Sequence, residues 1–168
     1  MQPQAVIRAH GLELAIPVGW NAEIFRLGDG SPADGDGPLN LTTRELENSP
    51  PVLHAATLDL PRGRGTYATE MIDRLGHGDA FVAVIDHGPE QARQEVFSMG
   101  VVPWPLLPDH FDPSASPQTK TGLVFVQRFF NQRDRAFALF AGIDEGPGRA
   151  VPVGRVNALL AGLKVMGH

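Results

Sequence analysis

The sequence predicts a single α/β domain of the α+β type, built mainly on an antiparallel β-sheet with helices on its faces. Segment 122–143 alternates as two apolar arms about a polar loop, which is typical of a β-hairpin. Segment 152–163 carries apolar residues at helical spacing. The chain has 168 residues, of which 42% are hydrophobic, so it can bury one sizeable core, and a second domain is not expected.

The hairpin is expected to lie at the centre of the sheet, because both of its arms are apolar on both faces. Phe125 and Phe129 share one face of the first arm, and the return arm 136–143 alternates in the same way. Strands with two apolar faces are usually covered on both sides. Between the arms we expect a polar loop of four or five residues at 131–135.

The rest of the chain is expected to alternate between strands, helices and loops. Two short strands at 6–10 and 12–16 meet at a tight turn, and a strand at 21–27 completes a small meander. Further strands are predicted at 52–60 and 80–86, and helices at 66–75 and 89–97. Thr66 would cap the first helix and Pro89 would begin the second. The predicted helix 152–163 is followed by a short extended end at 164–166.

Two irregular segments interrupt this pattern. Segment 28–51 is rich in Gly, Pro and Asp and has little apolar surface to bury, so we expect it to be a flexible loop. Segment 98–120 is rich in proline and includes PWPLLP, so it should run over the surface without forming regular ladders.

The two ends of the chain resemble PsbP/Mog1-like α/β domains. The opening LELAIPVGWNAEI is an apolar strand that ends in Pro-x-Gly-Trp and is followed by another strand. The close is a long hairpin and then a helix ending in VNALLAGLKV. The resemblance implies an antiparallel sheet flanked by helices, in a family known for protein-binding and accessory roles more than for catalysis.

Composition argues against several classes of function. The chain has no cysteine, which excludes disulfides, thiolate nucleophiles and cysteine-ligated zinc. The net charge of -5, with two lysines against twelve arginines and no basic run longer than two residues, argues against nucleic acid as a partner. No secretory signal or membrane span is visible. We expect a soluble cytoplasmic protein, and the preference for arginine favours a GC-rich bacterial source.

The histidines do not form a metal-binding pattern. His77, His87 and His110 each stand beside an acidic residue, but no two histidines lie closer than ten residues. His54 falls on the apolar face of a strand, as expected for a hydrogen-bonded core histidine. Because Gly-x-Ser-x-Gly, Gly-x-Gly-x-x-Gly and Walker sequences are also absent, we assign no catalytic residue, metal or cofactor.

Two segments carry candidate binding residues. Arg62 and Arg64, in RGRG, would either cradle a phosphate or belong to a plain connecting loop. The Pro-rich VVPWPLLPDHF either covers the sheet, which is the favoured use, or is offered to a partner. Its candidate contact residues are Trp104, Leu106, Leu107 and His110.

These observations leave two hypotheses for function. The first is a non-catalytic protein-binding or accessory domain, such as a component of a larger assembly, whose partner is another protein or a second copy of the chain. The second is a small-molecule-binding domain or an enzyme, with a pocket between the hairpin and the Pro-rich segment. Arg128, His54 and His110 would supply the polar groups of that pocket.

Overall fold

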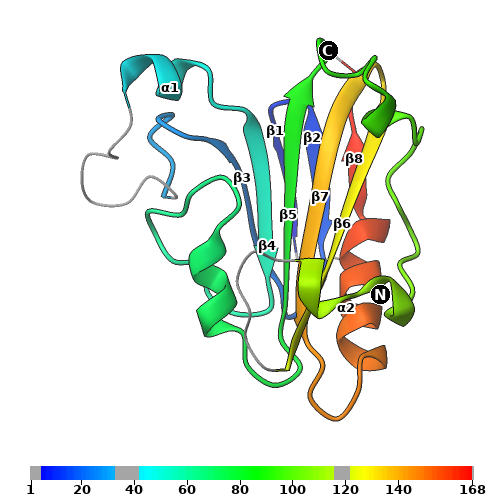
Figure 1. Cartoon of the computed structure of the whole chain (residues 1–168). Coiled ribbons are helices and arrows are strands. Elements are labelled where there is room, and N and C mark those ends of the chain that lie inside the picture. Colours follow the sequence, from blue (N-terminus) through cyan, green and yellow to red (C-terminus); the bar gives the residue numbers. More distant parts are fainter. Residues whose placement is uncertain (1–4, 33–41, 116–121, 168) are drawn as a thin grey trace.

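The computed structural model of the chain describes residues 5–32, 42–115 and 122–167 (Figure 1). These residues form two antiparallel sheets and one main helix, α2 (Ala150–Ala161). The smaller sheet has the order β1 (Ala5–Ala9), β2 (Leu12–Ile16), β8 (Leu163–Val165). The larger sheet has the order β3 (Asn21–Arg26), β4 (Pro51–Ala56), β5 (Ala80–Gly88), β7 (Arg135–Asp144), β6 (Leu123–Gln132).

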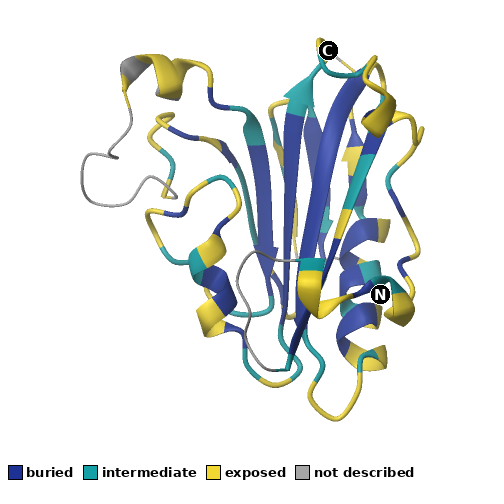
Figure 2. Cartoon of the chain, in the orientation of Figure 1, coloured by how far each residue is buried: buried dark blue, intermediate teal, exposed yellow. Residues whose placement is uncertain are grey.

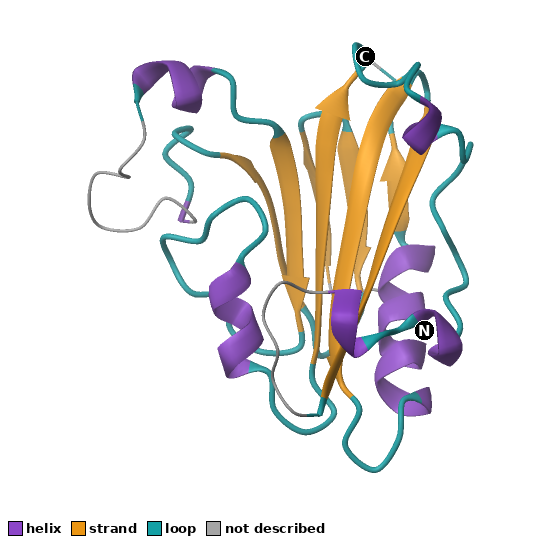
Figure 3. Cartoon of the chain, viewed as in Figure 1, coloured by secondary structure: helices purple, strands orange, loops and turns teal. Residues whose placement is uncertain are grey.

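The larger sheet is buried on both faces, as Figure 2 shows for its central strands. One hydrophobic cluster joins this sheet to α2 and to the smaller sheet, with Val82, Leu139 and Val156 among its members. A second cluster lies on the opposite face and includes Met71 and Ile72 of the 3₁₀ helix Thr69–Arg74. The predicted antiparallel sheet is therefore confirmed, and the described residues show one main helix in place of helices flanking its faces (Figure 3).

The two helices predicted in the middle of the chain were wrong in type. The first is the 3₁₀ helix Thr69–Arg74, which follows Ala68 at φ 44° and has no side-chain cap from Thr66. Segment 89–97 forms turns and ends in the 3₁₀ helix Glu95–Phe97. Phe97 is the one buried residue of this segment, so an α-helix here would have no apolar stripe to pack.

The predicted helix at 152–163 is present as α2, which begins two residues earlier. Val153, Val156 and Leu160 are buried, as their spacing predicts. Leu163 belongs to β8, because the helix ends at Ala161 and the chain turns at Gly162 to pair with β2. A Cβ atom at Gly162 would lie 2.5 Å from the carbonyl oxygen of Ala15, so only glycine allows this close approach of the helix end to β2.

The beginning of the chain is divided between the two sheets and does not form the meander that the sequence predicts. β1 and β2 pair through the turn at His10 and Gly11, but β3 pairs with β4 in the larger sheet. The turn before β3 contains Trp20, which is buried in the core between the sheets. The chain therefore crosses from one sheet to the other within its first 21 residues.

The hairpin is present, but its turn and its position differ from the prediction. Gln132 pairs with Arg135, so the loop has two residues, Arg133 and Asp134, both in the left-handed region at φ 51° and 56°. A two-residue turn of this kind is usually signalled by glycine, which the sequence lacks here. β7 is an interior strand between β5 and β6, whereas β6 is at the edge of the sheet.

The Pro-rich segment runs along the free edge of β6. Asp112 exchanges two backbone hydrogen bonds with Phe125, at 2.7 and 3.0 Å. Thirteen residues earlier, Met99 accepts a hydrogen bond from the backbone N–H of Asn131 at 2.6 Å. Between these two contacts lie prolines 103, 105 and 108, which cannot donate to a ladder. Residues 116–120 of this segment lie outside the described residues.

The segment expected to be a flexible loop is described only in part. Residues 33–41 lie outside the described residues, so the expectation of flexibility applies to a part that the structure does not cover. The described remainder contains α1 (Thr43–Glu47). Ser49 is buried, and its hydroxyl donates to the carbonyl of Leu27 at 3.0 Å.

A buried arginine joins the two sheets. Arg135, the first residue of β7, donates from Nε and Nη2 to Asp86 of β5. Its remaining donors reach the smaller sheet and its neighbours, at the carbonyls of His10 (3.1 Å), Gly11 (3.3 Å) and Met166 (3.2 Å). Both Arg135 and Asp86 are buried, so hydrogen bonds with protein groups replace the water that would otherwise solvate the two charges.

We expect Phe125→Ala to destabilise the protein by about 3–5 kcal/mol, because Phe125 is buried and stacks on Phe140. Phe129→Ala should cost less than about 3 kcal/mol, because its side chain is only partly buried against Phe97. Urea unfolding of the two variants measures the difference. Equal losses would show that Phe125 and Phe129, both on β6, are equally buried.

We expect Asp86→Ala to cost about 3–5 kcal/mol, since it leaves the Arg135 charge buried without its carboxylate. The double variant Asp86→Leu/Arg135→Leu should recover little of this loss, because the carbonyls of His10, Gly11 and Met166 would then lack their donor. Urea unfolding of both proteins is the measurement. If the double variant were as stable as the wild type, the whole loss of stability in Asp86→Ala would be due to the unpaired charge of Arg135.

Candidate functional site

Asn157 of α2 fastens the middle of the Pro-rich segment to the helix, and Arg149 at the start of α2 donates to the carbonyl of Phe111 at 2.8 Å. The side chain of Asn157 accepts a hydrogen bond from the backbone N–H of Leu106 at 2.7 Å and donates to its carbonyl at 2.8 Å. The indole Nε1 of Trp104 donates to the backbone carbonyl of Asn157 at 3.0 Å. These three bonds hold residues 104–106 in one position on the helix.

The side chains of this fastened segment are divided between the core and the surface. Leu106 and Phe111 are buried in the core, so the segment does cover the sheet. Trp104, Leu107 and Val101 are 55%, 53% and 61% exposed, respectively. The segment therefore covers the sheet with Leu106 and Phe111, as the favoured prediction has it, while Trp104, Leu107 and Val101 remain exposed to solvent.

A shallow groove of about 270 Å³ lies between this segment, the end of the hairpin and the end of α2. We call it the Trp104 groove. None of its lining residues is charged, and most are apolar. They are Val101, Val102, Trp104, Gln132, Leu160, Ala161 and Leu163.

The Trp104 groove lies where the sequence places a pocket for the alternative hypothesis, but its polar groups are different. Arg128 donates to the carbonyl of its neighbour Gln127 at 2.9 Å. His110 accepts the backbone N–H of Leu107 at 3.0 Å on Nδ1 and so stabilises a local turn. His54 is buried in the larger sheet. None of the three lines the groove.

The RGRG loop is built around a buried arginine. Arg64 is 1% exposed, and its Nη2 donates to Glu23 at 2.5 Å. Its Nε donates to Nδ1 of His54 at 3.1 Å, and its Nη1 donates to the carbonyl of Pro61. Arg62 is exposed at the surface. Because Arg64 is committed to these internal partners, the loop does not present the pair of arginines that would cradle a phosphate.

His54 is a neutral core histidine. Nε2 lies 2.8 Å from the carbonyl of Thr66 and must donate to it, because Nδ1 accepts from Arg64. The ring packs edge-on against Phe25 and Phe81. Burial is the main cause that lowers the pKa of His54 from 6.5 to about 3, and the nearby Arg64 charge acts in the same direction.

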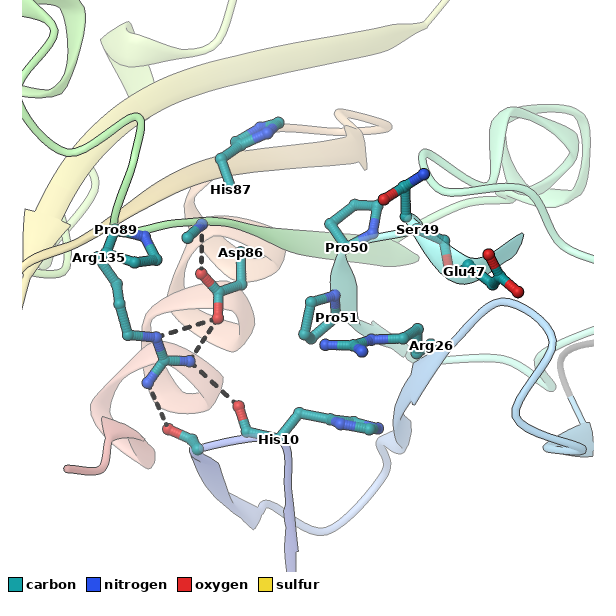
Figure 4. Close-up of a pocket in the computed structure, with 13 residues that line it drawn as sticks. His10, Arg26, Glu47, Ser49, Pro50, Pro51, Asp86, His87, Pro89 and Arg135 are labelled. Atoms are coloured by element: carbon teal, nitrogen blue, oxygen red, sulfur yellow. Dashed lines mark hydrogen bonds and ion pairs between the residues drawn. The ribbon is translucent and has the colours of Figure 1, made fainter. Parts of the chain in front are cut away.

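A second and larger cavity, of about 480 Å³, opens between the two sheets, and we call it the inter-sheet pocket (Figure 4). Its lining comes from the β1–β2 turn, the end of β3, the segment between α1 and β4, the end of β5 and the start of β7. Arg135 and Asp86 form one wall, and Arg26 and Glu47 lie on the other side of the cavity in this view.

Sequence reasoning missed this pocket because its residues are brought together only by the fold. The β5 wall contains an irregularity in which Asp86 pairs with Phe137 and Gly88 with Ala136, so His87 has no partner in the ladder. Burial lowers the pKa of His87, although the neighbouring Asp86 charge acts in the opposite direction. The run Asp86-His87-Gly88-Pro89 was the one local signal, and it reads equally well as an ordinary turn.

His10 contributes to the same pocket from the β1–β2 turn. Its backbone lies in the left-handed region at φ 50°, and its Nε2 is 3.5 Å from the carboxylate of Asp29. Burial alone would raise the pKa of Asp29, but hydrogen bonds from the backbone N–H groups of Arg26 and Ser31 and from His10 outweigh it and lower the pKa. Asp29 is therefore an ionised carboxylate that already has its partners.

Within the described ranges, no three His, Asp or Glu side chains come close enough together to hold a metal ion. No helix of these ranges is long and apolar enough to cross a membrane. No family model, curated protein or solved structure matches the chain.

We expect the stability of the protein to fall as the pH is lowered from about 6.5 toward about 3, since the unfolded chain protonates His54 in this range and the folded chain does not. This one group contributes a slope of about 1.4 kcal/mol per pH unit. His87, whose pKa is also lowered, acts in the same direction. Urea unfolding at several pH values should show a shallower slope for His54→Gln than for the wild type. Identical slopes would mean that His54 is protonated in the folded state.

Proposed function

We propose that the protein is a non-catalytic binding module that docks another protein at the Trp104 groove. The observation that carries the proposal is an exposed tryptophan held rigidly beside an apolar groove. Trp104 is 55% exposed although its indole N–H is bonded to α2, so solvent exposure does not result from a loose side chain. Tryptophan is enriched among the residues that contribute most to protein–protein binding.

The rigid attachment of the segment favours binding. A loop that must become ordered on docking loses conformational entropy, which weakens the complex. Here the bonds between Asn157 and Leu106 already fix the segment, and Val102 N–H donates to Gln132 at 3.3 Å on the other side of the groove. The surface is therefore formed before the partner arrives.

The composition of the groove indicates the chemistry of the partner. The chain has a net charge of -5, yet no charged residue lines the Trp104 groove. A partner that bound mainly through charge would have nothing to pair with at this place. The occupant is a partner protein that inserts an aliphatic or aromatic side chain beside Trp104, with Val101 exposed at the rim.

Selection of peptides from a displayed random library tests this proposal. Peptides enriched on the wild-type protein should share an apolar anchor residue and bind Val101→Asp and Trp104→Ala at least about tenfold more weakly. Val101→Asp is the sharper variant, because it adds a charge at the groove without removing any of the bonds to Asn157. Affinity should change little between about 50 and 500 mM salt, since the groove is uncharged.

Val151→Asp is the matched control, because Val151 is 72% exposed on α2 but does not line the groove. It should leave peptide binding unchanged. Peptides that bind all variants equally would contradict the proposal, as would a library that yields no peptide dependent on Trp104. Dimerisation in sedimentation experiments that Val101→Asp abolishes would assign the groove to a second copy of the chain instead.

A further inference from the structure

The inter-sheet pocket contains charged groups that the fold does not use. Arg135 directs all its donors to Asp86 and to the carbonyls of His10, Gly11 and Met166, so it belongs to the frame of the pocket. Asp86 accepts from Arg135 and from the backbone N–H of Gly88 at 2.9 Å. The charges of this wall are therefore already paired within the protein.

Arg26 and Glu47 differ from this pair. Both line the pocket and both are exposed. In the part of the chain that the structure describes, neither side chain forms an ion pair with the other or with any other group. In Figure 4 the Arg26 side chain extends from the end of β3 toward Pro51. The pocket thus offers one free cation and one free anion, each with its hydrogen-bonding capacity unused in the described residues.

The rest of the lining is suited to the body of a small molecule. Pro50, Pro51 and Pro89 present apolar ring surface. The nearby Asp29 is already paired with His10 and with backbone N–H groups, so it adds no free charge at this place. A cavity of about 480 Å³ is within the range of small-molecule sites, which is roughly 300–1,000 Å³.

We propose that the inter-sheet pocket binds a small zwitterion of the amino-acid class. The carboxylate of the ligand is held by the guanidinium of Arg26, which can form two parallel hydrogen bonds with it. The ammonium group donates to the carboxylate of Glu47. The prolines contact the apolar part of the ligand. A zwitterion can pair with both groups, whereas a simple anion pairs only with Arg26 and a simple cation only with Glu47.

Isothermal titration calorimetry of the full chain with the twenty proteinogenic amino acids tests this proposal. Propionate and propylamine serve as probes that carry one of the two charges each. At least one amino acid should bind with a Kd below about 1 mM, and both single-charge probes should bind at least about tenfold more weakly. Arg26→Gln and Glu47→Gln should each weaken the binding of that amino acid at least about tenfold.

Arg93→Gln and Glu95→Gln are matched controls, because both residues are exposed and neither lines the pocket. They should leave the Kd unchanged. The absence of binding by all twenty amino acids at millimolar concentration would overturn the proposal. Propionate binding as tightly as the best amino acid would also overturn it and identify a plain anion site. Val101→Asp should not affect amino-acid binding. The amino-acid proposal and the protein-docking proposal can therefore fail independently of each other.

Discussion

The buried guanidinium of Arg135 is the interaction on which the arrangement of the two sheets depends. A charge in the interior is stable only when its partners are complete, and here they come from β5, from the β1–β2 turn and from the residue after β8. The turn must also leave room for the arginine: a Cβ atom at Gly11, which has φ 74°, would lie 2.7 Å from Nη1. The same contacts that join the sheets thus form one wall of the inter-sheet pocket.

Elements determined by local pattern could be predicted from the sequence. The alternation in 123–130 and 136–143 identified both arms of the hairpin, and the helical spacing of Val153, Val156 and Leu160 identified α2. Features decided by distant contacts could not be predicted. The sequence does not distinguish Arg64 and Arg135 from surface arginines, because Glu23 and Asp86, their carboxylate partners, lie 41 and 49 residues away.

The two candidate sites also differ in how far the sequence could predict them. The apolar and proline-rich sequence around Trp104 marked a segment with a special role, but it did not show that Leu106 is buried while Leu107 is exposed. The position of Leu106 is set by its hydrogen bonds with Asn157, which lies 51 residues away in the sequence. The inter-sheet pocket has no comparable local signal, since separate turns and strand ends supply its lining. Of the eight candidate binding residues that the sequence suggested, only Trp104 lines either cavity.

The route of the Pro-rich segment along β6 protects an edge of the larger sheet from pairing with strands of other chains. Phe125 and Asn131 direct their backbone groups away from β7, so by the alternation of an antiparallel ladder Gln127 and Phe129 do the same. Between the contacts at Met99 and Asp112, the open edge of β6 is therefore a short stretch around Gln127 and Phe129. A neighbouring chain finds too little exposed backbone there to add a strand, and the prolines at 103, 105 and 108, which lack a backbone N–H, oppose templated β-pairing at this edge of the sheet.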